Sequence, residues 1–289
     1  MKKRIAFIGT GRKAWSLAQA FREAGYELAF AVSRTEKNLR HFSAHFKIAN
    51  TPKSTEELKA AFLEPVTVIL AVPDSEISPV AIELALLGLP IGGSLFIHLS
   101  GSKNSGELYP LLEKGALTGT LHIPQTFPTT DPVSIQGLPV AVEASSPEAE
   151  KILLQLAHDL NLHPICIAPE NKIYYHLAAV FASNFFPAIV ADSIKLFEKA
   201  GGSREDYFKI FAPIITTTFT NIIKHGPENS VSGVVSRKDS ETIGEHLAAL
   251  AADPVLREVL ASYLHLTAKT ADLLGVEVEM KNPEAGSNK

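Results

Sequence analysis

Short runs of apolar residues alternate with longer amphipathic segments over the first 168 residues of this chain. Continuous apolar runs predict strands covered on both faces at residues 4–8, 28–32, 66–72, 94–99, 118–122, 140–143 and 164–167. Apolar positions at helical spacing predict helices between them at residues 13–24, 36–45, 54–62, 77–87, 106–113 and 146–160. This alternation predicts an α/β fold with a doubly wound, mostly parallel sheet.

The pattern changes after residue 168, where strand-like runs stop and helical spacing continues. Residues 171–200 form one long apolar segment, which we expect to be a helix kinked at Pro187. Further helices are predicted at residues 204–224, 240–251 and 254–274, and the polar tail at residues 281–289 is predicted to be disordered. The chain is therefore expected to hold a cofactor domain at residues 1–168 and an all-helical domain at residues 169–289.

The first strand ends in a glycine-rich turn with the spacing of a dinucleotide-binding motif. Its first glycine permits a tight turn, its second lets the backbone approach a pyrophosphate, and a small third residue lets the next helix pack closely. That helix offers unpaired N–H groups and the positive end of its dipole to a phosphate. The predicted cofactor-binding residues here are Gly9, Thr10, Gly11, Arg12, Lys13 and Ala14. The alternative is an ordinary strand–turn–helix in which the glycines only permit the backbone turn and no dinucleotide binds.

The end of the second strand indicates which nicotinamide cofactor is bound. Sites for NAD usually carry an acid there, whereas this chain has Ser33 and Arg34. A hydroxyl and a guanidinium would bind a 2′-phosphate, which a carboxylate would repel. We therefore predict NADP, while Arg34 as a merely solvated arginine is the alternative.

Two more strands end at the same edge of the predicted sheet, outside which ligands bind in such folds. The residues at or just beyond their ends that we assign to the cofactor are Ala71, Val72, Pro73 and Ser100. Asp74 comes next after Pro73, so a plain turn is the alternative explanation of this segment.

Composition and charge narrow the classes of function. The formal net charge of −4 gives no general attraction to nucleic acid or to an anionic membrane. Every apolar run is interrupted by a polar residue before it reaches membrane-spanning length, and the first run is too short for a signal peptide, so we expect neither. The single cysteine, Cys166, is expected to be buried in a strand. Because one cysteine cannot form a disulfide framework or a cysteine-rich metal site, we expect neither. Such a low cysteine content is consistent with the reducing cytoplasm.

Five segments occur in an order that resembles a known family. They are Gly9-Thr10-Gly11, Ala71-Val72-Pro73-Asp74, His98-Leu99-Ser100-Gly101, the sequence LHIPQTFP at residues 121–128 and the sequence HLAAVFASNF at residues 176–185. Together they resemble the Rossmann-like proteins that carry a DUF2520 C-terminal domain, over nearly the whole chain to about residue 250. The resemblance implies NADP binding and a homodimer formed through the helical domain.

That family is similar in architecture to pyrroline-5-carboxylate reductases, prephenate dehydrogenases and 6-phosphogluconate dehydrogenase. The β-hydroxyacid dehydrogenases among such enzymes use a lysine, with an asparagine four residues later, on the long helix. This chain has His176, Ser183 and Asn184 on that helix, so their lysine mechanism is not implied.

Histidine suits the proton transfer that accompanies hydride transfer, because its reference pKa is near 6.5. His122 ends a predicted strand at the ligand-binding edge, a placement similar to the His-Pro segment of prephenate dehydrogenases. Gln125 follows in a loop constrained by proline and is assigned to substrate binding. In the alternative, His122 caps the strand and holds this loop. As a strand-end residue it is expected to contribute little to the core.

The long helix and a later loop supply the other candidates. His176 and Ser183 lie seven residues apart on one helical face, bordered by Asn184. We assign His176 and Asn184 to catalysis and Ser183 to substrate binding; a buried polar cluster that fixes helix packing is the alternative. Arg237 is assigned to clamping a substrate carboxylate, or else is a solvated loop residue.

These patterns predict an NADP-dependent oxidoreductase that acts on a small, anionic metabolite. The alternative is a non-catalytic sensor or regulator that binds NADP(H). In either case we expect a cytoplasmic homodimer with neither nucleic-acid nor membrane partners.

Overall fold

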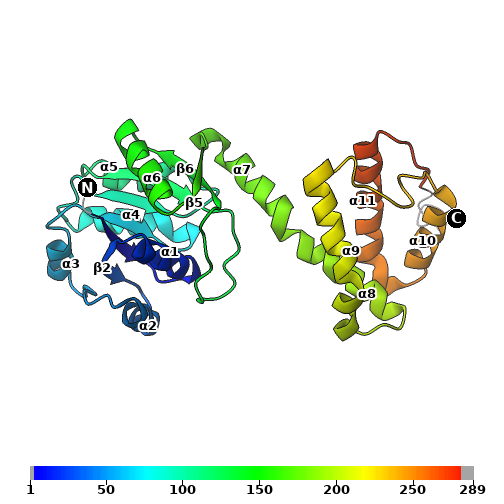
Figure 1. Ribbon diagram of the computed structural model, residues 1–289, viewed down its shortest axis with the longest axis horizontal. Helices are drawn as coiled ribbons and strands as arrows, with labels where there is room; N and C mark the ends of the chain where they lie inside the picture. The colour runs from blue at the N-terminus through cyan, green and yellow to red at the C-terminus, as the bar shows by residue number, and fades with distance from the viewer. Residues whose placement is uncertain (1–2, 281–289) are drawn as a thin grey trace. The chain divides into compact units, whose positions relative to one another are not determined.

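A computed structural model describes residues 3–280 and contains one seven-stranded sheet (Figure 1). The strands are β1 (Arg4–Ile8), β2 (Glu27–Val32), β3 (Thr67–Leu70), β4 (Leu95–His98), β5 (Leu117–His122), β6 (Pro139–Ala144) and β7 (His163–Cys166). Their order across the sheet is β2-β1-β3-β4-β5-β6-β7. The predicted doubly wound α/β fold is confirmed.

The two faces of the sheet are covered by different helices. Helices α1 (Arg12–Glu23), α2 (Glu36–Phe46) and α6 (Pro147–Asp159) share one apolar cluster with alternate strand residues. Helices α3 (Thr55–Ala61), α4 (Ile77–Leu86) and α5 (Tyr109–Leu112) share the other. Within β1, Phe7 belongs to the first cluster and Ala6 to the second, as the period-two geometry of a strand requires.

One strand pair runs antiparallel. β6 pairs antiparallel with β5, while every other pair in the sheet is parallel. A loop at residues 123–138 joins β5 to β6 without a helix, whereas the connection between neighbouring parallel strands usually contains one.

Strand register brings four polar side chains to one face of the sheet. His98 on β4 is paired with Thr120 on β5, and Thr120 is paired with Glu143 on β6. His122 lies two residues beyond Thr120 and therefore points to the same face. This face is the one that α3, α4 and α5 cover, because Phe96, two residues before His98, packs in their cluster.

Helices dominate the chain after β7. They are a 3₁₀ turn (Pro169–Asn171), α7 (Lys172–Ala179), a π-helical turn (Val180–Asn184), α8 (Phe186–Lys199), α9 (Arg204–His225), α10 (Ser240–Ala251), a second 3₁₀ turn (Pro254–Leu256) and α11 (Arg257–Leu274). The chain divides into two compact units between Asn184 and Phe185. The domain boundary at residue 169 stays a prediction.

The expected kink at Pro187 is wrong in position. The long helical segment is instead interrupted by the π turn at Val180–Asn184, and Pro187 is the second residue of α8. The N–H groups in the first turn of a helix make no hydrogen bond within that helix. A proline there removes no such bond, so it does not kink the helix.

One further expectation is corrected, and the expectation of no membrane span stays a prediction. Cys166 is exposed, because β7 is the edge strand and all four of its residues are exposed. The segment Pro169–Lys199 is long and apolar enough to cross a membrane by length and composition, and its most apolar 18-residue window has a mean hydropathy of 1.6. Only 6% of its most apolar window is buried within the chain, and one such helix is weak support for a span. The predicted disordered tail at residues 281–289 lies outside the described residues.

Candidate functional site

The glycine-rich turn after β1 has the geometry that its sequence predicted. Gly9 has a φ of +93°, and a Cβ at this position would lie 2.4 Å from the carbonyl oxygen of Ala71. Gly11 is the N-cap of α1, which has neither a side-chain cap nor an acid in its first turn. Thr10 is 5% exposed, and its Oγ1 is buried without a hydrogen-bond partner in the described chain. The helix therefore begins with donors that an anion could satisfy.

A hollow of about 410 Å³ lies at this edge of the sheet. Its lining residues are Gly11, Arg12, Lys13, Ala71, Val72, Pro73, Asp74, Leu99, Gln125 and Phe127. They come from the loops after β1, β3, β4 and β5, and many are residues that the sequence assigned to the cofactor or substrate. The order of strands changes direction between β1 and β3, where ligands bind in folds of this kind.

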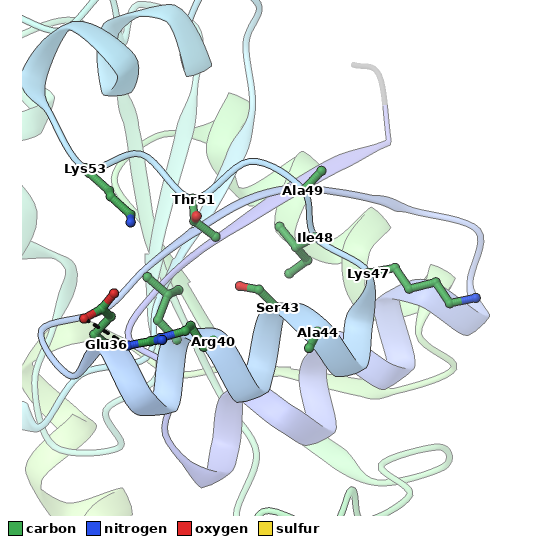
Figure 2. A pocket seen from close by; sticks show the side chains of 10 residues that line it. Glu36, Arg40, Ser43, Ala44, Lys47, Ile48, Ala49, Thr51 and Lys53 are labelled. Carbon is green, nitrogen blue, oxygen red and sulfur yellow. Dashed lines mark ion pairs between the residues drawn. The ribbon is translucent and has the colours of Figure 1, made fainter.

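A larger hollow, of about 550 Å³, lies beside α2 instead (Figure 2). It is lined by α2 and the segment after it, and an ion pair of 3.2 Å joins Arg40 to Glu36 at its rim. None of the residues that the sequence assigned to a site lines it. Because it lies away from the loops that follow β1 and β3, we base the candidate site on the smaller hollow.

Two basic side chains of the glycine-rich turn reach neighbouring loops. Arg12 donates from Nη1 to the carbonyl oxygen of Pro128 at 3.2 Å, and Lys13 donates from Nζ to that of Leu99 at 3.3 Å. Burial lowers the pKa of Lys13, and the charge of Asp74 opposes this shift. The side chain of Lys13 thus lies at the end of β4.

Ser100 holds the loop after β4 together. Its Oγ donates to Asp74 Oδ2 at 2.6 Å and accepts from the backbone N–H groups of Ser102 and Lys103. His98 is equally engaged: it accepts from the Ser100 N–H at Nδ1 and lies 2.9 Å from the Asn104 carbonyl at Nε2. Burial lowers the pKa of His98 to about 4, so this ring is a neutral structural link.

His122 pairs with a tyrosine that the sequence analysis did not identify. Its Nδ1 lies 2.8 Å from the hydroxyl of Tyr175, on α7, and the two rings meet edge to face. Nε2 makes no hydrogen bond within the described chain. Burial, followed by the charge of Lys13, lowers the pKa of His122 to about 4, so the ring is neutral near pH 7. With an exposed fraction of 9%, His122 contributes more to the core than expected.

A buried ion pair fixes the start of α7. Lys172 Nζ donates to Thr120 Oγ1 at 2.7 Å and lies 3.3 Å from Glu143 Oε2. The other oxygen of Glu143 accepts from both the N–H and the hydroxyl of Ser105. Burial lowers the pKa of Lys172, and the charge of Glu143 opposes this shift. Glu143 therefore links the loop after β4 to the helix that carries Tyr175.

Two family models match the sequence, a Rossmann-like domain at residues 1–123 and a domain of unknown function, DUF2520, at residues 138–270. The chain is a Rossmann-like protein with a DUF2520 domain. The DUF2520 match begins with β6, so it includes two strands of the sheet as well as Glu143, Lys172 and Tyr175. The family resemblance inferred from sequence segments is confirmed.

Solved structures share the fold of this DUF2520 protein. A Bacteroides fragilis protein provisionally described as an NADP oxidoreductase is 25% identical, with a TM-score of 0.72 over 94% of this chain and 98% of that one. An imine reductase from Myxococcus stipitatus, in complex with NADP⁺, is 15% identical, with a TM-score of 0.67 over 93% of this chain and 94% of that one.

Prephenate dehydrogenase from Aquifex aeolicus, in complex with hydroxyphenyl propionate and NAD⁺, is 18% identical, with a TM-score of 0.56 over 94% of this chain and 98% of that one. At such identities the last two structures show the fold alone. No protein of curated function matches the sequence.

Other predicted site residues of the DUF2520 protein are less engaged. His176 has a buried Nδ1 without a partner in the described chain, and it contributes to the lowered pKa of His122. Ser183 and Asn184 are exposed in the π turn, so their helical register with His176 is broken. Arg237 is exposed in the second unit. The assigned roles of all four residues stay predictions.

The sequence analysis did not identify four residues that contact the candidate site residues or one another. Glu143 and Lys172 could have been identified from the sequence, because each is a charged residue in or beside a strongly apolar strand or helix. No sequence pattern distinguishes Tyr175 or Glu76. Glu76 comes after β3 and lies 2.9 Å from Nη1 of Arg34, a contact that depends on two strands being brought together.

Proposed function

We propose that this protein is an NADP-dependent oxidoreductase that acts on a small, anionic metabolite. The observation that carries the proposal is that a helix N-terminus with open donors and the buried His122–Tyr175 pair belong to the same edge of one sheet. The 25% identity to the Bacteroides fragilis protein supports this class of function. The positive charge of Lys13, which acts on His122, favours an anionic substrate.

The residues of the turn fit a dinucleotide pyrophosphate. Among residues 3–280, the Thr10 hydroxyl has no hydrogen-bond partner and α1 has no side-chain cap, and phosphate oxygens could satisfy both. The close approach of Gly9 to Ala71 leaves no room for a side chain there. The cofactor residues assigned from the sequence, from Gly9 to Ser100, are retained as part of this proposal.

When bound, a nicotinamide cofactor supplies or accepts the hydride, and the protein must manage one proton. Neutral His122 can do this at Nε2, the nitrogen that has no hydrogen-bond partner among the described residues. If the Tyr175 hydroxyl donates to Nδ1, Nε2 carries the proton and can donate to a substrate oxygen or nitrogen. If the hydrogen bond reverses, Nε2 can accept a proton instead. The direction of the Tyr175 hydrogen bond is thus coupled to the tautomer of His122.

A screen of metabolite extracts tests the proposal directly. We expect at least one fraction to cause a protein-dependent change in NADPH absorbance. A protein that binds NADPH tightly but turns over nothing in such extracts would instead be the NADP(H) sensor that the sequence left as the alternative.

Substitution of Arg34 tests the choice of cofactor. We propose that Ser33 and Arg34 bind the 2′-phosphate, and a charge-assisted hydrogen bond is worth roughly 1.5–3 kcal/mol. Arg34→Ala should therefore weaken NADPH binding by about 10–100-fold and leave NADH almost unchanged. Calorimetric titration with both cofactors measures the difference. Equal affinity of the unaltered protein for NADH and NADPH would rule out this role.

The second unit is proposed to form a cytoplasmic homodimer. Large apolar side chains are exposed along α8 and α9, namely Ile189, Leu196, Phe208, Ile210, Ile214, Phe219, Ile222 and Ile223. A second copy of the chain would cover such a surface, which is uncommon on monomers. Light scattering in detergent-free buffer should report a dimer at micromolar concentration. A monodisperse monomer, or a protein that stays in solution only with detergent, would contradict the proposal.

A further inference from the structure

Arg34 already has an acidic partner at the edge where the cofactor is proposed to bind. Its Nη1 lies 2.9 Å from Oε2 of Glu76. Glu76 ends a 3₁₀ turn that follows β3, whereas Arg34 follows β2. Because β1 lies between these two parallel strands, their carboxyl ends meet at one edge. Residues 33–35, directly after β2, include no acid, but the fold supplies one from the turn after β3.

We propose that Glu76 sets the preference between NADP and NAD. Its carboxylate competes with a 2′-phosphate for Arg34, and it can accept a hydrogen bond from a ribose hydroxyl of NAD. The inference rests on the proposed function, because it assumes that the adenosine ribose binds at the end of β2.

The contact is weak enough to yield to a phosphate. The side chain of Arg34 is 77% exposed and that of Glu76 is 34% exposed, so solvent screens their attraction. Glu76 occupies one of the five N–H donors of the guanidinium, which leaves others for phosphate oxygens. NADP can therefore bind, but with a carboxylate close to its 2′-phosphate.

The same carboxylate has the opposite effect on NAD. A ribose hydroxyl donates to a carboxylate, and this is the role of the acid in sites for NAD. Asp74, the neighbouring acid of the turn, accepts from the hydroxyls of Ser100 and Ser102. Glu76 is therefore the acid of this turn that is positioned to act on NADP through Arg34 and on NAD directly.

Glu76→Gln separates these effects from general surface charge. The substitution removes one negative charge and keeps the size and hydrogen-bonding capacity of the side chain. Glu83→Gln is the matched control, because Glu83 is exposed on α4 and loses the same charge. Dissociation constants of NADPH and NADH are measured for the full chain by calorimetry, with melting curves to verify folding.

We expect Glu76→Gln to strengthen NADPH binding by about 3–10-fold and to weaken NADH binding by about 2–5-fold. Glu83→Gln should leave the ratio of the two constants within about 2-fold of the unaltered protein. The gain for NADPH should shrink at high salt, which screens exposed charges, and in the Arg34→Ala background, which removes the shared partner.

Two outcomes would overturn the inference in distinguishable ways. If Glu76→Gln and Glu83→Gln give the same ratio while Arg34→Ala still weakens NADPH, Glu76 has no part in selection and the proposed function stands. If the unaltered protein binds neither cofactor, the proposed function itself fails, and the role of Glu76 fails with it.

Discussion

Replacing Lys172 with methionine is expected to lower the free energy of unfolding by about 3–5 kcal/mol. The side chains of Lys172 and Glu143 are only 2% and 3% exposed, so the substitution leaves a carboxylate buried without its counter-ion. It also removes the donor to Thr120. Urea unfolding followed by the fluorescence of Trp15 measures the effect, because this single tryptophan is 4% exposed in α1 of the same unit.

Two further variants identify the cause of the loss. Lys103→Met breaks an exposed pair with Glu107 in the same unit and should change stability by less than about 1 kcal/mol. The double variant Lys172→Met with Glu143→Gln removes both buried charges, keeps an acceptor for Ser105 and should recover much of the loss. If the double variant is as unstable as Lys172→Met, the loss comes from packing and not from the unpaired charge.

Most of the fold could be predicted, because the first four strands contain continuous apolar runs between turn-forming residues. The direction of β6 could not, since the loop at residues 123–138 has the length of a crossover but contains no helix. The π turn at Val180–Asn184 was missed for a related reason. Apolar spacing marks a helix there but does not show where an extra residue enters a turn, and Pro187 drew attention to the wrong position.

The candidate site was predictable where its chemistry is local. Gly9 and Gly11 act through the backbone that immediately surrounds them, so their spacing was sufficient. Contacts between distant segments were not visible. Tyr175 reaches His122 across 53 residues, and Glu76 reaches Arg34 across 42. Residues 33–35 hold no acid, as the sequence analysis noted, yet in space Arg34 lies beside the carboxylate of Glu76.

Replacing His122 with asparagine is expected to lower turnover by about 10²–10⁴-fold, the largest effect that we predict on activity. The imidazole is proposed to hold or receive the proton at Nε2. Asparagine lacks the two ring nitrogens between which an imidazole can relay a proton. NADPH affinity should change by less than about 3-fold, because the pyrophosphate is proposed to bind at the turn after β1. The rate of NADPH oxidation is measured with the substrate that the metabolite screen identifies.

The neighbouring hydroxyl provides the control for a structural role. Tyr175→Phe keeps the edge-to-face contact with His122 and removes only its hydrogen-bond partner, so it should lower turnover by about 10-fold and leave the melting temperature almost unchanged. If His122→Asn lowers melting temperature and NADPH affinity together, the histidine holds the loop at residues 123–138 and has no separate catalytic role.

The pH profile shows which form of His122 acts. Burial lowers its pKa to about 4, so the neutral ring predominates above about pH 5 and gives way to imidazolium only as the pH approaches 4. Turnover that needs the neutral ring should be level from about pH 8 to pH 5 and fall below that. A rise in turnover as the pH falls through 5 would show instead that imidazolium is the proton donor. Because the charge of Lys13 is the next largest cause of the lowered pKa, Lys13→Met should move the acidic limb of the profile to higher pH.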